Sequence, residues 1–433
     1  MLTALARAFR TPDLRRKLLF TLGVVVLVRI GSFVPTPGVD YSAVQKCIAQ
    51  AQTSTSLLGL VNLFSGGALL QLSVFALGIM PYITASIIIQ LLTVVIPRFE
   101  ELKKEGQSGT TKLTQYTRYL TIALAVLQST TYVSIARDPA RLFQTSCTAQ
   151  VVPDQSVPTI VLMVLTMTAG TGLIMWLGEL VTERGVGNGM SLLIFTQITA
   201  GFPASLWGIE RSRGPLTFAA VLVMGLVVVA AVVAVEQSQR RVPVQYAKRM
   251  IGRRMYGGTS TYIPLKVNMA GVIPVIFASS LLYLPALVAQ FNDQNSTWVR
   301  WVDTHLVRGD HPFYMIAYFL LIIFFAFFYV AITFNPDEVA ENMRKYGGFI
   351  PGVRAGRPTA EYLDYILTRI TLPGALYLGI ISLLPLIALV VFNANSNFPF
   401  GGTSILILVG VGQETVKQIE SQLQQRNYEG FLR

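Results

Sequence analysis

The sequence predicts an all-α polytopic membrane protein with ten transmembrane helices. Of its 433 residues, 52% are hydrophobic and only 13% are charged, and this charged fraction is about half that of a typical soluble domain. The apolar residues occur in long blocks, and a membrane-spanning helix needs about 20 mostly apolar residues. A short internal repeat places glycine and proline inside two of these blocks. Together these observations favour a helical bundle in a membrane.

The ten predicted spans follow the apolar blocks in chain order. They lie at 18–34, 69–96, 118–136, 158–181, 188–207, 216–236, 268–290, 313–333, 371–392 and 402–420. Residues 1–17 are basic and predict an amphipathic surface helix. No small-residue cleavage site follows the first block, so we interpret it as a retained anchor rather than a signal peptide. Most of the 34 lysines and arginines fall on the side of the N-terminus, which predicts that both termini are cytoplasmic.

The repeat links the second and seventh spans. Both copies contain a Gly-x-x-Pro followed by Ile-x-Ala-Ser; the matched residues are Gly78, Pro81, Ile83, Ala85 and Ser86 in one copy and Gly271, Pro274, Ile276, Ala278 and Ser279 in the other. Two hydrophobic segments interrupted by glycine and proline at matching places in two halves indicate a pathway at the repeat interface.

A short apolar segment at 57–67 precedes the second span. It is too short to cross a membrane, and such segments are buried, re-entrant or interfacial. One interpretation is a helix that lies on the outer surface. The other is an element folded back into the bundle on a glycine hinge, where it closes a pore; its principal residues are Leu57, Leu60, Phe64, Gly66 and Gly67.

The two larger loops on the predicted inner side are rich in arginine, glycine and proline. Runs at 242–246 and 259–265 predict a hairpin that projects into the cytoplasm, and loop 334–370 has a tip rich in glycine and proline. Their arginines suit a partner with an anionic surface, including ribosomal RNA, although basic inner loops also serve topology alone. The glycines of 185–191 predict a tight turn, because the strand and Gly-Lys-Ser/Thr of a phosphate loop are missing.

The sequence contains no arrangement of residues for metal, nucleotide or covalent chemistry, so we predict no cofactor and no enzymatic activity. His305 and His311 lack metal-ligand spacing. Cys47 and Cys147 both fall in predicted outer loops, where a disulfide is compatible with an oxidising compartment, but their spacing does not require one.

The polar residues inside the predicted spans are almost all uncharged. A secondary transporter for small solutes, the alternative function, normally places ionisable groups near the bilayer midplane. An intramembrane protease would need catalytic motifs that no span contains. Uncharged polar groups serve either as ordinary contacts between helices or as a seam weak enough to open; they are Thr84, Ser86, Gln90, Gln128, Thr196, Gln197, Asn268, Ser279 and Ser280.

Several motifs resemble the SecY family, which forms the channel of the Sec protein translocase. They occur in order along the chain and include Phe64-Ser-Gly-Gly-Ala-Leu, Phe75-Ala-Leu-Gly-Ile-Met-Pro-Tyr-Ile, Thr182-Glu-Arg-Gly, Gly187-Asn-Gly and Pro264-Leu-Lys-Val-Asn-Met-Ala-Gly-Val-Ile-Pro. The resemblance implies two inverted five-helix halves, 1–207 and 208–433, around an hourglass pore closed from outside by a plug helix at 57–67. It also implies a channel that moves unfolded, signal-bearing polypeptides across the membrane and releases transmembrane segments sideways into lipid.

The resemblance further assigns three sets of residues. The hydrophobic constriction ring comprises Ile79, Ile83, Met190, Ile194, Ile276 and Ile407, of which Met190 departs from the usual isoleucine. The lateral gate comprises Thr84, Ser86, Gln90 and Gln128 on one side and Asn268 and Leu284 on the other. The docking face for a SecA motor or a ribosome comprises Arg240, Arg241, Arg249, Arg253, Arg254, Arg354 and Arg357.

The resemblance also implies partners and a location. The expected partners are SecE and SecG subunits, the SecA ATPase, the ribosome, signal sequences and unfolded preproteins, membrane lipids, an insertase and accessory membrane subunits. The expected location is the bacterial inner (plasma) membrane.

Overall fold

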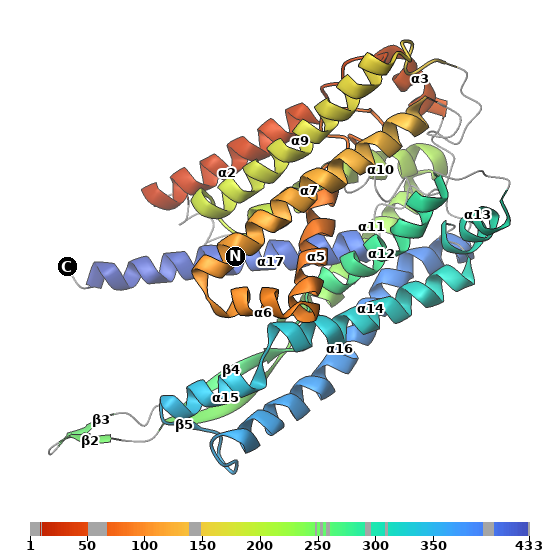
Figure 1. Ribbon diagram of the computed structural model, residues 1–433. Coiled ribbons are helices and arrows are strands. Elements are labelled where there is room, and N and C mark those ends of the chain that lie inside the picture. Colours follow the sequence, from red (N-terminus) through yellow and green to blue (C-terminus); the bar gives the residue numbers. More distant parts are fainter. Residues whose placement is uncertain are drawn as a thin grey trace.

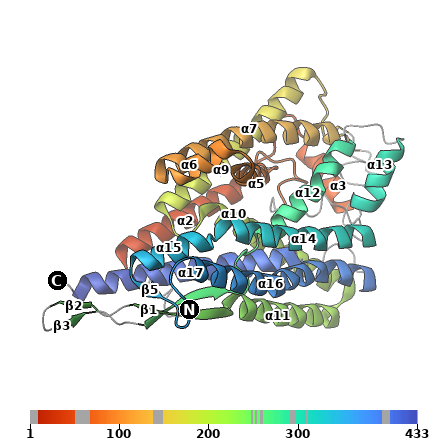
Figure 2. The same cartoon turned by 60° about the horizontal axis from the view of Figure 1, so that its bottom comes forward.

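The structure, a computed structural model, describes residues 9, 11–50, 67–137, 149–246, 249–251, 254–256, 260–290, 296–307, 311–392 and 402–431. Within these residues each predicted span contains one long helix (Figures 1 and 2). The long helices are α2 (Pro12–Gly31), α5 (Met80–Val95), α7 (Gln107–Ala136), α9 (Val157–Arg184), α10 (Gly189–Arg213), α11 (Pro215–Gln237), α12 (Ile273–Gln290), α14 (Pro312–Thr333), α16 (Arg357–Phe392) and α17 (Gly402–Phe431).

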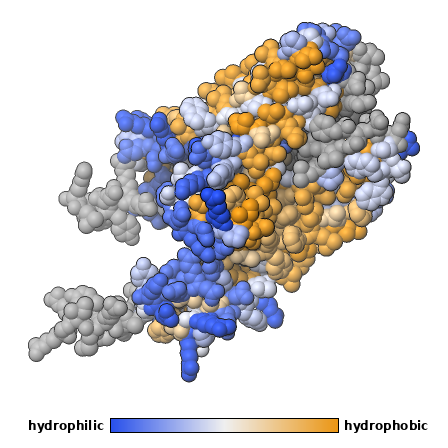
Figure 3. Space-filling model, viewed as in Figure 1, coloured by the Kyte–Doolittle hydropathy of each residue, from blue (hydrophilic) through white to orange (hydrophobic). Residues whose placement is uncertain are grey.

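The helices have the character of a multi-pass membrane protein. Among the described residues, four are long and apolar enough to cross a membrane by length and composition, and the pair α5 and α6 (Pro97–Lys104), bent by 100°, would make a fifth. The four are Gln107–Ala136, Val157–Arg184, Pro312–Lys345 and Arg357–Leu384. Figure 3 shows an apolar band between two polar ends, as a bilayer requires.

The second and seventh spans begin later than the sequence predicted. Residues 67–79 fold into turns, and α5 starts only at Met80. Leu72 and Gly78 have positive φ angles of 47° and 56°, which a right-handed helix excludes. The prediction was wrong here because buried turns and spanning helices both use apolar residues.

Both copies of the repeat surround the N-terminus of a helix. Gly78 lies two residues before α5, and Gly271 lies two residues before α12, with φ angles of 56° and 61°. In each copy the proline is the second helical residue, where its missing N–H costs no hydrogen bond. Glycine permits the left-handed conformation that re-aims the chain, so the repeat sets where the two helices begin.

The predicted hairpin is confirmed and is larger than expected. Strands β1 (Gln239–Tyr246) and β4 (Ser260–Lys266) pair antiparallel, and the small strands β2 (Arg249–Ile251) and β3 (Arg254–Tyr256) pair beyond them. A third strand, β5 (Gly348–Phe349), pairs with β1 and completes a sheet of order β4-β1-β5. Loops 237–267 and 334–370 therefore form one structure.

Loop 334–370 is more helical than its glycines and prolines indicated. It contains α15 (Pro336–Lys345), and α16 begins at Arg357 rather than near residue 371. The Asn335 side chain accepts hydrogen bonds from the backbone N–H groups of Asp337 and Glu338 and so caps α15. The sequence prediction missed these helices because it searched for apolar spans, and both segments are polar.

Three short helices lie at the end of the bundle opposite the β-strands (Figure 1). They are α3 (Tyr41–Gln50), α13 (Thr297–Val302) and the π-helix η1 (Asp303–Val307). Cys47 of α3 is fully buried and disulfide-bonded. Cys147, the other cysteine of the chain, lies outside the described residues. The disulfide that the sequence left open is therefore present at Cys47.

Candidate functional site

The six residues of the predicted ring converge in one hydrophobic cluster. Ile79, Met190, Ile194 and Ile407 are buried members of this cluster, and Ile83 and Ile276 pack against it; we call these six residues the ring. They come from the starts of α5, α10 and α12 and from the first turns of α17. Helices that are far apart in the sequence thus bring aliphatic side chains to one place.

The repeat explains two of these positions. Ile83 is the fourth residue of α5, and Ile276 is the fourth residue of α12. Each donates its backbone N–H to a residue of the preceding turn, Ile83 to Ile79 at 3.1 Å and Ile276 to Val272 at 3.3 Å. The two helix starts therefore place an isoleucine at the same position of each helix, and both isoleucines pack against the same cluster.

A polar network at the end of α9 fixes the start of α10. The hydroxyl of Thr182 donates to the carbonyl of Gly178 at 3.0 Å and accepts from the N–H of Gly189 at 2.9 Å. Gly187 has a φ of +83°, which confirms the tight turn predicted for 185–191. Since Met190 follows this turn directly, the network positions a ring residue.

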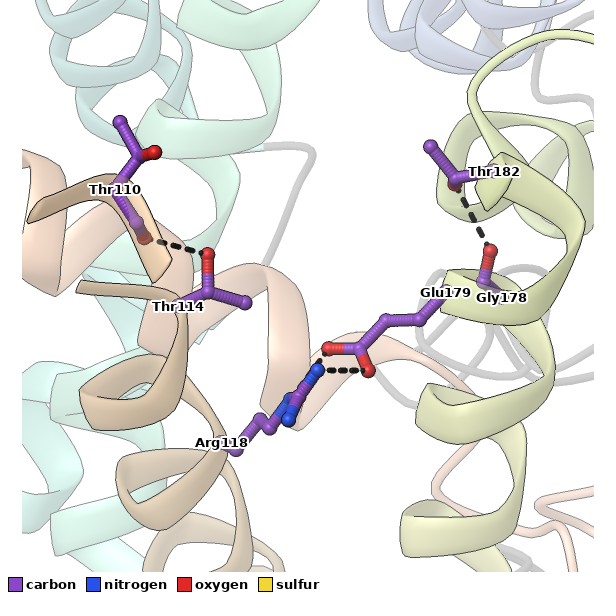
Figure 4. Close-up of polar contacts among 6 residues, drawn as sticks. All are labelled: Thr110, Thr114, Arg118, Gly178, Glu179 and Thr182. Carbon is purple, nitrogen blue, oxygen red and sulfur yellow. Dashed lines mark hydrogen bonds and ion pairs between the residues drawn. The ribbon is translucent and has the colours of Figure 1, made fainter. Parts of the chain in front are cut away.

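An ion pair joins α7 to α9 beside this turn (Figure 4). The Arg118 guanidinium donates from Nε to Oε1 of Glu179 at 2.9 Å, and its Nη2 lies 2.7 Å from Oε2. Two parallel N–H···O bonds give such a pair a fixed geometry. The carboxylate is the less exposed partner, at 18% against 46% for the arginine, so the guanidinium compensates a charge that is largely withdrawn from water.

The predicted gate residues other than Asn268 lie on α5, α7 and α12, and these helices border each other. Helix α5 packs on α7 and contacts α12, and Ile87 of α5 belongs to the same buried cluster as Val275 and Leu282 of α12. Thr84 is buried and donates its hydroxyl to the carbonyl of Met80 at 3.0 Å. The remaining assigned positions differ in burial: Gln128 is buried, Ser86 is partly buried, Gln90 is exposed, and the side chain of Leu284 is outside the described set.

Asn268 has a role that the sequence did not indicate. Its side-chain amide donates to Oε1 of Glu236 at 2.6 Å and to the carbonyl of Gly271 at 3.1 Å. These bonds join the end of α11, the base of the β4-β1-β5 sheet and the start of α12. Glu236 is therefore a site residue that sequence reasoning missed, because a single carboxylate at the end of an apolar block usually reaches the interface.

Four of the seven predicted docking arginines lie on β1 or near the start of α16. Arg240 and Arg241 lie on β1, and Arg354 and Arg357 lie just before and at the start of α16; all four are exposed. The Arg241 guanidinium lies 4.8 Å from the centre of the Tyr262 ring, and Arg357 pairs with Glu361 at 3.2 Å. Arg249 and Arg254 belong to β2 and β3, whereas Arg253 is not among the described residues.

The predicted plug is the part of the site that the structure describes least. Leu57, Leu60, Phe64 and Gly66 lie outside the described residues. Gly67 is described, has a φ of +90° and opens the run of turns that leads to α5.

The comparisons with known proteins agree along the whole chain. The SecY family model matches residues 73–416. The protein translocase subunit SecY of Streptomyces galbus is 69% identical over 437 residues, and that of Mycobacterium tuberculosis (strain ATCC 25618 / H37Rv) is 59% identical over 443 residues; in both cases 100% of each chain is covered.

Solved structures share the fold at low identity. The one described as "The structure of a protein conducting channel" has a TM-score of 0.63 and 18% identity, and the match covers 94% of this chain and 91% of that one. Sec61 in the canine ribosome-channel complex gives a TM-score of 0.60 at 18% identity, with the same coverage. With a family model matching most of its residues and relatives well above half identity over its full length, the chain belongs to the SecY family.

Proposed function

We infer that this SecY-family chain is the channel subunit of a protein translocase, not an enzyme. Unfolded polypeptides with signal sequences cross the membrane through it, and transmembrane segments leave it sideways into lipid. The observation that carries this inference is the convergence of six aliphatic side chains from both halves of the chain in one cluster. The full-length relatives are named protein translocase subunits, and the described helices are those of a multi-pass membrane protein.

The ring acts as a seal. Aliphatic side chains offer a moving polypeptide no hydrogen bond and no charge, so they enclose it without holding it. A hydrophobic constriction also resists ions, because it empties of water when no chain fills it. Met190 keeps this property, since its thioether side chain is flexible and apolar.

The two halves, 1–207 and 208–433, meet along a seam that opens. Helix α10 contacts α11 and α17, and α5 contacts α12. The seam between α5 and α12 is the lateral gate, where a signal sequence replaces apolar contacts such as those of Ile87 with its own. Hydrogen bonds between membrane helices average only about 0.6 kcal/mol, so the polar gate residues hold the seam weakly.

The segment at 57–67 closes the channel from outside as a plug. Support comes from its place in the chain, between α3 at the outer end and the buried turns of 67–79 that lead to the ring. Gly66 and Gly67 supply the hinge on which the segment leaves the pore.

The cytoplasmic assembly of β4, β1 and β5 is the docking face for a SecA motor or a ribosome. Its exposed arginines suit carboxylates and phosphates, which a guanidinium binds with two hydrogen bonds. SecE and SecG complete the complex in the bacterial inner membrane, and both termini of this chain lie in the cytoplasm. An insertase and accessory membrane subunits would meet the lateral gate from the lipid side.

Reconstitution tests this function. The chain is placed in proteoliposomes with SecE and SecG, and SecA, ATP and an unfolded preprotein are added. Preprotein that carries a signal sequence becomes protected from protease, whereas the same preprotein without its signal does not. Absence of protection, together with saturable uptake of a small solute by the same vesicles, would instead support a secondary transporter.

A further inference from the structure

The short helix α13 has one buried face and one exposed aromatic face. Val299 and Val302 are buried against Ala289 of α12. Trp298 and Trp301 do not belong to this cluster and keep 43% and 48% of their surfaces exposed. Two large tryptophan rings on a six-residue helix form an exposed aromatic patch, which calls for a covering partner.

A chain of ring contacts holds this patch against α14. The rings of Trp301 and His305 stack with their centres 5.0 Å apart, and the rings of Trp301 and Phe313 meet edge to face at 5.8 Å. The ring centres of His305 and His311 are 4.6 Å apart. Nδ1 of His311 accepts a hydrogen bond from the backbone N–H of Phe313 at 3.2 Å, and this bond caps α14. The orientation of the tryptophans is therefore fixed relative to a membrane-spanning helix.

The patch continues a lipid-facing stripe. Along α14 the exposed residues Phe313, Ile316, Leu320 and Phe324 recur at spacings of three and four residues, which places them on one face of the helix. This helix is long and apolar enough to span a membrane, so the stripe faces acyl chains. Phe313 is its first member and contacts Trp301, so the tryptophans lie where the lipid-facing surface ends.

We propose that α13 and η1 form an interfacial anchor whose tryptophans insert among the phospholipid headgroups of the outer leaflet. An indole ring suits this zone because its apolar body enters the acyl boundary while its N–H reaches polar groups. The histidines serve as ring partners within the anchor: among the described residues no three His, Cys, Asp or Glu side chains come together as a metal site needs. The assignment to the outer leaflet, but not the contact with lipid, rests on the proposed orientation.

The anchor also fixes one end of the proposed gate. Ala289 belongs to the last turn of α12, and its packing against Val299 and Val302 ties that turn to the anchor. Figures 1 and 2 place α13 at the far end of the bundle from the β2–β3 hairpin. When the gate opens, α12 therefore moves relative to an outer end that is held at the membrane surface.

Fluorescence of single-tryptophan chains in bromolipid vesicles tests the anchor. One chain keeps only Trp298 and another only Trp301, with Trp176, Trp207 and the remaining anchor tryptophan changed to Phe. Lipids brominated near the headgroup quench both chains about twofold more strongly than lipids brominated near the acyl end, as expected for side chains at headgroup level. Iodide in the surrounding buffer quenches them weakly.

A chain that keeps only Trp176 is the matched control, because this residue is exposed on the membrane-spanning α9 and is quenched by brominated lipid. Strong iodide quenching of Trp298 and Trp301 without bromolipid quenching overturns the proposal and indicates a water-facing or protein-facing patch. Stronger quenching by the deep bromines also overturns it.

The side of the membrane is tested separately. Thr304→Cys, at an exposed position of η1, reacts with an impermeant maleimide from outside. Reaction from inside only would contradict the proposed orientation while leaving the lipid contact intact.

Discussion

Replacing Ile79 or Ile407 with asparagine makes the idle channel leak ions and admit polypeptides that lack a signal sequence. Both side chains are fully buried in the ring cluster. An amide without a hydrogen-bond partner there costs roughly 1–3 kcal/mol, and it also lets water into a constriction that seals by drying. Because each 1.4 kcal/mol is a factor of ten, the open state gains roughly 5- to 140-fold relative to the closed state. Conductance of planar bilayers and export of a signal-less reporter measure the effect.

Two controls separate loss of the seal from loss of the fold. Ile79→Leu nearly conserves volume and polarity and should keep the bilayer tight. Leu363→Asn places the same amide in a different buried cluster, beneath the β4-β1-β5 sheet, and should lower stability without raising conductance. Wild-type conductance from well-expressed Ile79→Asn and Ile407→Asn chains would show that these residues do not form the seal.

Replacing Asn268 with leucine destabilises the protein strongly, and replacing Glu236 with leucine as well restores much of the loss. The single change leaves the half-buried Glu236 carboxylate without the amide that donates to it at 2.6 Å. Stranding a buried polar group costs about 1–3 kcal/mol, and more when it is charged, whereas removing both partners is nearly neutral. The free energy of unfolding in a detergent titration measures both variants.

The same pair predicts a functional effect. The Asn268 amide ties the base of the β4-β1-β5 sheet to the start of α12. If this sheet is the docking face proposed above, the Asn268→Leu chain responds less to SecA than the wild type does. Glu236→Gln keeps an acceptor oxygen for Asn268 and is the matched control, with nearly normal stability and response. Additive losses in the double leucine variant would mean that the two side chains act independently.

Hydrophobicity located the helices well but their ends poorly. Each apolar block contains a helix because only helices and closed barrels satisfy their backbone groups in lipid. Leu69 and Leu77 are equally apolar yet lie in turns, because burial inside the bundle selects the same residues as lipid does. The pairing of β1 with β5 could not be predicted either. Strand β5 has only two residues and lies about a hundred positions after β1, so no sequence pattern marks it as a strand.

The ring shows where sequence reasoning ends. The repeat relates Ile83 to Ile276, and each is the fourth residue of its helix. The other members needed the family resemblance, because Leu193 and Ile198 of α10 are just as buried as Ile194 and share its chemistry. The bond between Asn268 and Glu236 was missed for a related reason: two common polar residues, 32 positions apart, carry no motif.

Disulfide crosslinking across the proposed gate tests the central claim most directly. Thr84→Cys on α5 and Leu284→Cys on α12 are combined in a chain with Cys47→Ala and Cys147→Ala, whose own translocation activity is measured first. The account predicts that oxidation forms the crosslink and stops translocation of a signal-bearing preprotein. Reduction of the crosslink restores translocation. A crosslink that never forms, or that forms while translocation continues, would contradict a gate between α5 and α12.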